Sequence, residues 1–433
     1  MVTGMAWWPL TYAQRARLVR DQVRGPVPFN LNVTFDVDGH IDEAALRAAL
    51  GRLMSSHPML RAHLSPDAAG MLVPATCEPD LVVRAGLTAD EVERALAERG
   101  DRFPDRRRPP LWSCQLLSTV DGRQVLAFTF DHLVMDAGSM SIALRDFVSG
   151  AVRDGDPAGA DAYGAFAADQ QARYGSGAAD ALAYWHEHLR GTALNRPVVP
   201  SFCLDPKGPL AGRRQAVTVA FDAGQRSLVA AGAARHRVTL FVLYLAAVAA
   251  VLSKVSGERD MTIRVLTSGR RPQFAETVGW FANMVLLRLS DVDVGDQGRL
   301  VATVRGTWAR QLPHQTVPYQ LVLKHIEPER TITDYRPSVV TVNALTVGPP
   351  LRFGDARLVG RPDAGGAGEE PGLQFVLIYG AGVMAVECWH DPARYAAADL
   401  AMLLDMLKQQ LLDMAEAPRG AARAARTGWQ PTA

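Results

Sequence analysis

Cysteine is scarce in this chain, and its distribution excludes two ways of stabilising a fold. The four cysteines, Cys77, Cys114, Cys203 and Cys388, are scattered over 433 residues, and none belongs to a Cys-x-x-Cys pair. This spacing argues against a structural zinc site and against a disulfide framework. We therefore expect a reducing, cytoplasmic location and no bound metal.

The chain also lacks an excess of charge and a long apolar run. Its formal net charge is +1, which gives no electrostatic reason to expect a nucleic acid or an anionic membrane as partner. The longest apolar run, Leu240 to Leu252, is too short to cross a bilayer and is typical of a buried helix. The first eight residues do not join a basic segment to an apolar core, so we predict no signal peptide.

Several common catalytic patterns are missing as well. The sequence contains no Gly-x-Ser-x-Gly segment of the kind that presents a hydrolase serine. The glycines at 365, 366 and 368 do not follow a predicted strand and open a helix, as a phosphate-binding loop requires. The histidines do not have a metal-ligand spacing on one helix face. These absences leave serine hydrolysis, nucleotide binding and metal chemistry without support.

What is present predicts a large mixed α/β protein. With 48% hydrophobic residues, 433 residues can form two substantial cores. Strand-like runs alternate with amphipathic helical runs in both halves of the chain. A Pro- and Gly-rich stretch without clear periodicity separates the halves, so we predict an N-terminal unit at 1–190, a linker at 191–213, a C-terminal unit at 214–417 and a disordered tail at 418–433.

The segment from Phe128 to Ser139 is the most informative one. A strand-like run ends here and a helix-like run follows, with His132 and Asp136 at the turn between them. An imidazole ionises near neutrality, so His132 could deprotonate a nucleophile or simply orient it. The alternatives are structural: His132 as a packed core histidine and Asp136 as a helix N-cap.

Six segments, in this order, resemble those of the condensation-domain superfamily of nonribosomal peptide synthesis, which includes free-standing acyltransferases. They correspond to its Ser-x-Ala-Gln, His-x-x-Leu-Arg, His-His-x-x-x-Asp-Gly, Tyr/Trp helix, Gly-Arg with Gly-x-Phe-Val-Asn, and His-Gln-x-x-Pro-Phe segments. In this chain they lie at Pro9–Arg15, Ser56–Leu64, Asp131–Ala137, Tyr163–Trp185, Gly269–Asn283 and His314–Gln320.

The resemblance implies two chloramphenicol acetyltransferase-like lobes arranged in a V around a central tunnel that accepts phosphopantetheine arms. It implies that His132 acts on an amine or hydroxyl that attacks a thioester. Asp136 and Arg270 would form a structural ion pair that holds the histidine loop. The substrate-binding residues that we expect along the tunnel are Ala137, Gly138, Ser139, Asn283, Thr341, Asn343 and Tyr379.

Two residues depart from the family's central motif. Asp131 replaces the first histidine, and Ala137 replaces the glycine. A carboxylate beside His132 could raise the pKa of the imidazole or fix its tautomer, so we predict a catalytic role for Asp131 next to His132. The methyl group of Ala137 could narrow the tunnel and restrict the acyl group.

Two other functions within the superfamily stay open. Asp131, Asp136 and Ser139 also fit the Asp-x-x-x-x-Asp-x-x-Ser motif of heterocyclisation domains, and Pro337 to Thr341 faintly resembles a second segment of those domains. A condensation-like domain without activity could instead recruit a carrier protein or a tailoring enzyme. That platform hypothesis predicts that His132→Ala leaves the biological output unchanged.

We predict a free-standing, monomeric, cytoplasmic acyltransferase of natural-product or antibiotic biosynthesis. It would form an amide or ester between a thioester and an amine or alcohol. No bound cofactor is expected, because the acyl group would arrive on an acyl or peptidyl carrier protein, or as a coenzyme A thioester. The run from Arg106 to Arg108 is interpreted as a solvated turn or as a small patch facing an acidic carrier.

Overall fold

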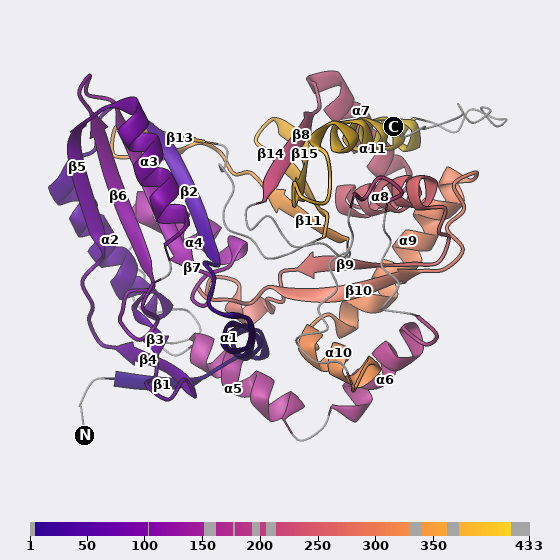
Figure 1. Cartoon of the computed structure of the whole chain (residues 1–433), viewed down its shortest axis with the longest axis horizontal. Helices are drawn as coiled ribbons and strands as arrows, with labels where there is room; N and C mark the ends of the chain where they lie inside the picture. The colour runs from indigo at the N-terminus through magenta and orange to yellow at the C-terminus, as the bar shows by residue number, and fades with distance from the viewer. Residues whose placement is uncertain are drawn as a thin grey trace.

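The structure is a computed structural model that describes residues 5–102, 104–150, 162–175, 178–192, 200–204, 214–329, 340–361 and 372–416. Two six-stranded sheets lie in separate lobes, and a three-stranded sheet lies beside the first (Figure 1). The predicted mixed α/β class is therefore confirmed. The predicted linker at 191–213 lies mostly outside the described residues, and the predicted tail at 418–433 lies wholly outside them.

The sheet of the N-terminal lobe is built around a fully buried strand. Its order is β12-β13-β2-β7-β6-β5, with bounds Leu351–Phe353, Ala356–Gly360, Asn30–Asp38, Gln124–Asp131, Trp112–Thr119 and Leu81–Leu87. Every residue of β7 is buried, because Leu126, Phe128 and Phe130 enter the main core of the lobe while Val125 enters a smaller cluster under a helix. Both faces of the sheet are therefore covered at β7.

Three capped helices cover this sheet. They are α2 (Glu43–Ser56), α3 (Ala89–Gly100) and α4 (Ala137–Ser149), and their N-cap side chains are Asp42, Thr88 and Asp136. Each cap oxygen accepts a hydrogen bond from a backbone N–H of the first turn, which has no partner within the helix. Residues of α2 and α4 belong to the main core, and Val92 and Ala95 of α3 belong to the smaller cluster.

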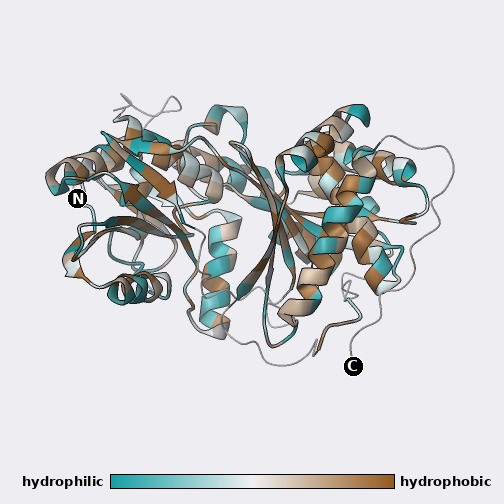
Figure 2. Cartoon of the chain, turned by 90° about the horizontal axis from the view of Figure 1, so that it is seen from above, coloured by the Kyte–Doolittle hydropathy of each residue, from teal (hydrophilic) through white to brown (hydrophobic). Residues whose placement is uncertain are grey.

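The core of the second lobe contains a six-stranded sheet and a long apolar helix. The order of the sheet is β10-β9-β11-β14-β15-β8, with bounds Asn283–Leu289, Met261–Thr267, Thr341–Thr346, Gln374–Gly380, Val383–His390 and Gln215–Ala220. Its helices are α7 (Ala223–Arg235), α8 (Leu240–Ser256), α9 (Gln297–Gln311) and α11 (Ala397–Ala415). The predicted buried helix is confirmed, since the run is buried in α8 from Val242 to Leu252, and hydrophobic segments appear brown along the helices in Figure 2.

Membrane spanning was tested on the described residues. None of their helices alone has the length and apolar character needed to cross a bilayer. The pair α7 and α8 reaches that length and composition only together, and the two helices are bent by 98° relative to each other.

The two large sheets repeat one topology. The neighbours β2, β7, β6 and β5 pair antiparallel, antiparallel and parallel. The neighbours β8, β15, β14 and β11 follow the same pattern, and a helix follows both β7 and β15. In each lobe the last residue of the central strand pairs with the first residue of its neighbour: Asp131 with Asn30, and His390 with Gln215. Asp131 and His390 therefore occupy equivalent strand ends.

The lobes exchange segments, which differs from the predicted boundaries at 190 and 214. Strands β12 and β13 come from the second half of the sequence but extend the first sheet, because β13 pairs with β2. In return, helix α6 (Ala179–His188) places Leu182 and Trp185 in the core of the second lobe. Residues Phe274 and Phe281 belong to the core of the first lobe. Each lobe is thus completed by the other half of the chain.

The remaining elements lie near the junction of the lobes or beside the first sheet. Strands β1 (Met5–Pro9), β4 (Gly70–Pro74) and β3 (His63–Leu64) form the small sheet. Helices α1 (Tyr12–Arg24), α5 (Ala162–Tyr174) and α10 (Tyr319–Ile326) lie with α6 along the lower edge in Figure 1. Helix α5 packs on β1, and α10 contacts both α1 and α6.

His390 provides a test of this buried core. The side chain is 1% exposed. Burial lowers the pKa of His390, because the cation would lose its hydration. The unfolded chain then binds more protons, so the free energy of unfolding should decrease as the pH falls through about 6.5. In urea titrations at several pH values, His390→Gln should show a shallower decrease than wild type, whereas exposed His40→Gln should not. An unchanged pH dependence in His390→Gln would refute this assignment.

Candidate active site

His132 follows the last residue of β7 and lies between two aromatic rings. Its backbone N–H donates to the carbonyl of Phe29, at 2.9 Å. The imidazole stacks on the Phe29 ring, with centroids 4.4 Å apart and planes 14° apart. The Trp280 ring also contacts the imidazole, with the ring centroids 4.5 Å apart and the planes tilted by 45°. The ring is therefore held by one residue of each half of the sequence.

The surroundings of His132 favour the neutral imidazole. Burial lowers its pKa below the usual 6.5, and the carboxylates of Asp136 and Asp131 oppose this shift without reversing it. A hydrogen bond to the backbone of His132 also opposes the shift, and the residue as a whole is partly exposed. The neutral ring can thus act as a proton acceptor at neutral pH.

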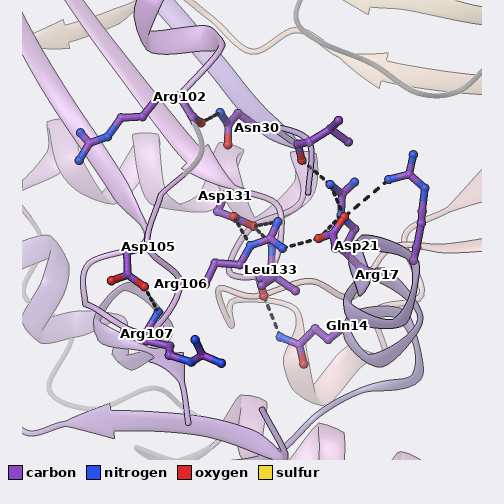
Figure 3. A network of polar contacts seen from close by, with 12 residues as sticks. Gln14, Arg17, Asp21, Asn30, Arg102, Asp105, Arg106, Arg107, Asp131 and Leu133 are labelled. Atoms are coloured by element: carbon purple, nitrogen blue, oxygen red, sulfur yellow. Dashed lines mark hydrogen bonds and ion pairs between the residues drawn. The ribbon is translucent and has the colours of Figure 1, made fainter. Parts of the chain in front are cut away.

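Asp131 does not face this imidazole with a free carboxylate. Its Oδ2 atom accepts from Nε of Arg106 at 2.7 Å, and its Oδ1 atom accepts from the Leu133 N–H at 2.8 Å (Figure 3). The predicted catalytic contact between Asp131 and His132 is not among these bonds. The prediction that Arg106 lies in a solvated turn is wrong, since Arg106 is 7% exposed; its neighbours Arg107 and Arg108 are exposed.

The predicted pair of Asp136 and Arg270 is present and joins the two halves of the sequence. Nη2 of Arg270 lies 3.3 Å from Oδ1 of Asp136. Asp136 also caps α4 through the Ser139 N–H, and its Oδ2 atom accepts from the N–H groups of Phe281 at 2.8 Å and Ala282 at 2.9 Å. Both the ion-pair role and the N-cap role therefore hold for Asp136.

Ser139 was predicted as a substrate-binding residue, but its hydroxyl is committed elsewhere. The side chain is completely buried. Its Oγ donates to the Gly279 carbonyl at 2.6 Å and accepts from Nη2 of Arg270 at 2.7 Å. An added Cβ at Gly279 would lie 2.1 Å from the Tyr163 ring, so glycine is needed where this segment packs on α5. Ser139 is thus a structural link between α4 and a segment from the second half of the sequence.

The other predicted binding residues are divided between two places. Ala137 and Gly138 begin α4, with Ala137 partly buried and Gly138 exposed. Thr341 and Asn343 lie on β11 and Tyr379 on the neighbouring β14. The Thr341 hydroxyl is buried and accepts from Arg264, and the Asn343 side chain accepts from the Ala344 N–H. The structure gives these three residues no contact with His132.

Asn283 is used for structure and also lines a pocket. Its amide donates to the carbonyls of Gln315 and Val317 and accepts from the Tyr319 N–H. The pocket lies beside Trp280 and between the lobes, and its lining includes Thr11, Gln170, Tyr174, Trp280, Asn283 and Gln320. Trp280 therefore contacts both this pocket and the imidazole of His132.

Sequence reasoning missed Phe29, Arg106 and the role of Trp280. Trp280 lies in the Gly269–Asn283 segment that carries the family resemblance, but the sequence does not indicate its contact with His132. Phe29 and Arg106 become neighbours of the site only through the pairing of β2 with β7 and the folding of the 104–111 turn. Within the described residues, no three His, Cys, Asp or Glu side chains are grouped closely enough to hold a metal ion.

Comparison with known proteins defines the class and then the family. The fold is the pseudo-dimer of two chloramphenicol acetyltransferase-like lobes that condensation domains share. The first condensation domain of the calcium-dependent antibiotic synthetase, in complex with a substrate analogue, matches with a TM-score of 0.75 at 20% identity and covers 97% of this chain and 99% of its own. The condensation-domain profile matches residues 6–344, so this chain belongs to the condensation-domain family.

Two further relatives frame the comparison. Phosphinothricin tripeptide synthetase PhsC of Streptomyces viridochromogenes is 31% identical over 349 residues, which cover 75% of this chain and 31% of the synthetase. The chain thus spans about a third of the length of that relative. The X-domain from teicoplanin biosynthesis, in complex with OxyB, matches with a TM-score of 0.79 at 21% identity over 98% of this chain and 96% of its own. At this identity the likeness establishes the fold alone.

Proposed function

We propose that this condensation domain forms an amide or ester bond by transferring an acyl group from a thioester to an amine or hydroxyl. The observation that carries this proposal is the imidazole of His132 at the end of β7, held between the rings of Phe29 and Trp280, where burial lowers its pKa. The nucleophile attacks the thioester carbonyl, and the neutral imidazole accepts its proton or orients it. The carbon–sulfur bond breaks, and the leaving sulfur takes up a proton to become a thiol.

The substrates would reach His132 from the space between the lobes. The pocket beside Trp280 has walls from both lobes. Arg173 and Arg271 line it together with Asp169, which pairs with both, so its charged lining carries an excess positive charge. That excess suits an anionic group such as the phosphate of a pantetheine arm. Acyl or peptidyl carrier proteins are therefore the proposed donors of the thioester, with coenzyme A as the alternative.

Further proposals concern the whole protein. The chain could act as a free-standing, monomeric enzyme in the cytoplasm, and its tunnel could open on both sides of a V. Heterocyclisation would need Asp131 or Asp136 to act on the product. Both carboxylates are bound to arginines, which gives that alternative less support. The platform alternative draws only on shared fold with the X-domain.

Intact-mass spectrometry of loaded carriers tests the proposal. Candidate acyl carriers are mixed with the purified chain and with amine or alcohol acceptors, with and without the chain. We expect the acyl mass to leave the donor carrier and appear on the acceptor. A product lighter by one further water would indicate heterocyclisation. Stable binding of carriers or of an oxidase without transfer, across a panel of donors and acceptors, would contradict the proposal and favour the platform.

A further inference from the structure

The ion pair between Asp131 and Arg106 is the first link of a longer chain of charges. Nη1 of Arg106 lies 2.5 Å from Oδ2 of Asp21, on helix α1. Arg17, one turn earlier on the same helix, lies 2.9 Å from the other oxygen of Asp21. The charges alternate as minus, plus, minus and plus, and the four side chains are between 1% and 9% exposed (Figure 3). The charges of these four side chains cancel and are mostly shielded from water, and the more exposed Arg20 also lies 3.8 Å from Asp21.

This chain of ion pairs leads back to the imidazole. The guanidinium carbon of Arg17 lies 4.6 Å from the centre of the Phe29 ring, and its Nη2 donates to the Val27 carbonyl at 2.5 Å. Phe29 stacks on His132 and also accepts the His132 backbone N–H. Asp131 therefore reaches His132 in two ways: as its neighbour in sequence, and through Arg106, Asp21, Arg17 and Phe29.

Removing one member would leave the remainder unbalanced. A buried charge without its partner is strongly destabilising, whereas removing both members of a pair costs much less. Asp131 stands where the resemblance places a histidine, and a neutral histidine there would leave Arg106 without half of its negative partners. The residue at 131 and the residue at 106 are therefore matched to each other.

We propose that Asp131 and Arg106 are a matched pair of positioning residues, which together with Asp21 and Arg17 hold Phe29 and the imidazole of His132 in place. The departure from the family motif at position 131 is then compensated by Arg106 rather than being a sign of lost function. The inference rests on the proposed function only for what His132 does, because the ion pairs hold the ring whichever reaction takes place.

The test is an NMR titration of ring-labelled histidine in the full chain, with the His132 signals assigned from His132→Ala. In Asp131→Asn the pKa of His132 should fall by about 0.5 pH unit or more, because a nearby negative charge is lost. In Arg106→Met it should rise by a similar amount, because Asp131 is no longer neutralised. The double variant should return close to wild type. A merely structural loosening would expose the ring and raise the pKa in both single variants.

Arg107→Met is the matched control, because Arg107 is the exposed neighbour in the same turn. It should leave the titration unchanged. If a single variant does not fold, the double variant and Arg106→Lys still test the pairing, since both keep the charges balanced. Equal titration of His132 in wild type, both single variants and the double variant would overturn the inference, even if acyl transfer is observed. If no acyl transfer is observed but the pKa of His132 still falls in Asp131→Asn and rises in Arg106→Met, the proposed function fails while this inference holds.

Discussion

His132→Ala should reduce the rate of acyl transfer by about 10²- to 10⁴-fold, the range that a positioned acid–base group contributes. The imidazole is a titratable group that contacts the aromatic rings of both Phe29 and Trp280. Alanine removes the proton acceptor while leaving both flanking rings in place. The rate is measured by intact-mass spectrometry of the donor carrier at saturating acceptor.

Exposed His40 provides the control, because His40→Ala changes the same chemical group away from the site. It should transfer acyl groups at the wild-type rate. The pH dependence gives a second readout: since the pKa of His132 is lowered, the wild-type rate should hold until the pH falls below about 6.5 and then decrease. The acid limb should disappear in His132→Ala. Equal turnover of wild type and His132→Ala at neutral pH would show that the imidazole is not used and would favour the platform alternative.

The central motif could be predicted because its logic is local or recognisable from residue order. His132 lies at a strand-to-helix turn that periodicity alone indicates, and Asp136 caps the following helix as its position suggests. The pair of Asp136 and Arg270 spans 134 positions, and only the resemblance could connect them. The apolar helix that begins at Leu240 could be predicted as well, because an apolar run of that length is stable in water only when it is buried in a core.

The errors have a common physical cause, which is that long-range pairing leaves no local pattern. Three consecutive arginines are typical of a solvated turn, yet Arg106 forms ion pairs with two buried carboxylates, one from α1 and one from β7. Ser139 was predicted as a substrate-binding residue, but its hydroxyl donates to the Gly279 carbonyl, 140 positions away in the sequence. The hairpin of β12 and β13 was assigned to the second lobe because sequence position suggested it, while its strand partner is β2.

Asp136→Asn should lower the free energy of unfolding by about 3–5 kcal/mol, the cost of leaving a buried charge without its partner. Asp136 is 3% exposed, and its two oxygens accept from Arg270 and from three backbone N–H groups. In the asparagine variant, one of these oxygens becomes an NH₂ group. If this group takes the place of Oδ2, it faces the N–H donors of Phe281 and Ala282, so two donors lose their acceptor and a third is added.

The matched control is Asp121→Asn, because Asp121 pairs with Arg123 at 2.8 Å but both side chains are exposed. Its loss of stability should be much smaller than that of Asp136→Asn, because surface ion pairs contribute little. Adding Arg270→Met to Asp136→Asn should recover little of the loss. The charge without its carboxylate partner is removed, but the Ser139 hydroxyl and the carbonyls of Phe274 and Thr277 lose their donor, and the backbone donors stay unsatisfied. Urea unfolding of the four proteins measures these differences. An Asp136→Asn variant as stable as Asp121→Asn would show that the link between the two halves of the sequence depends on Ser139 and the apolar contacts rather than on this carboxylate.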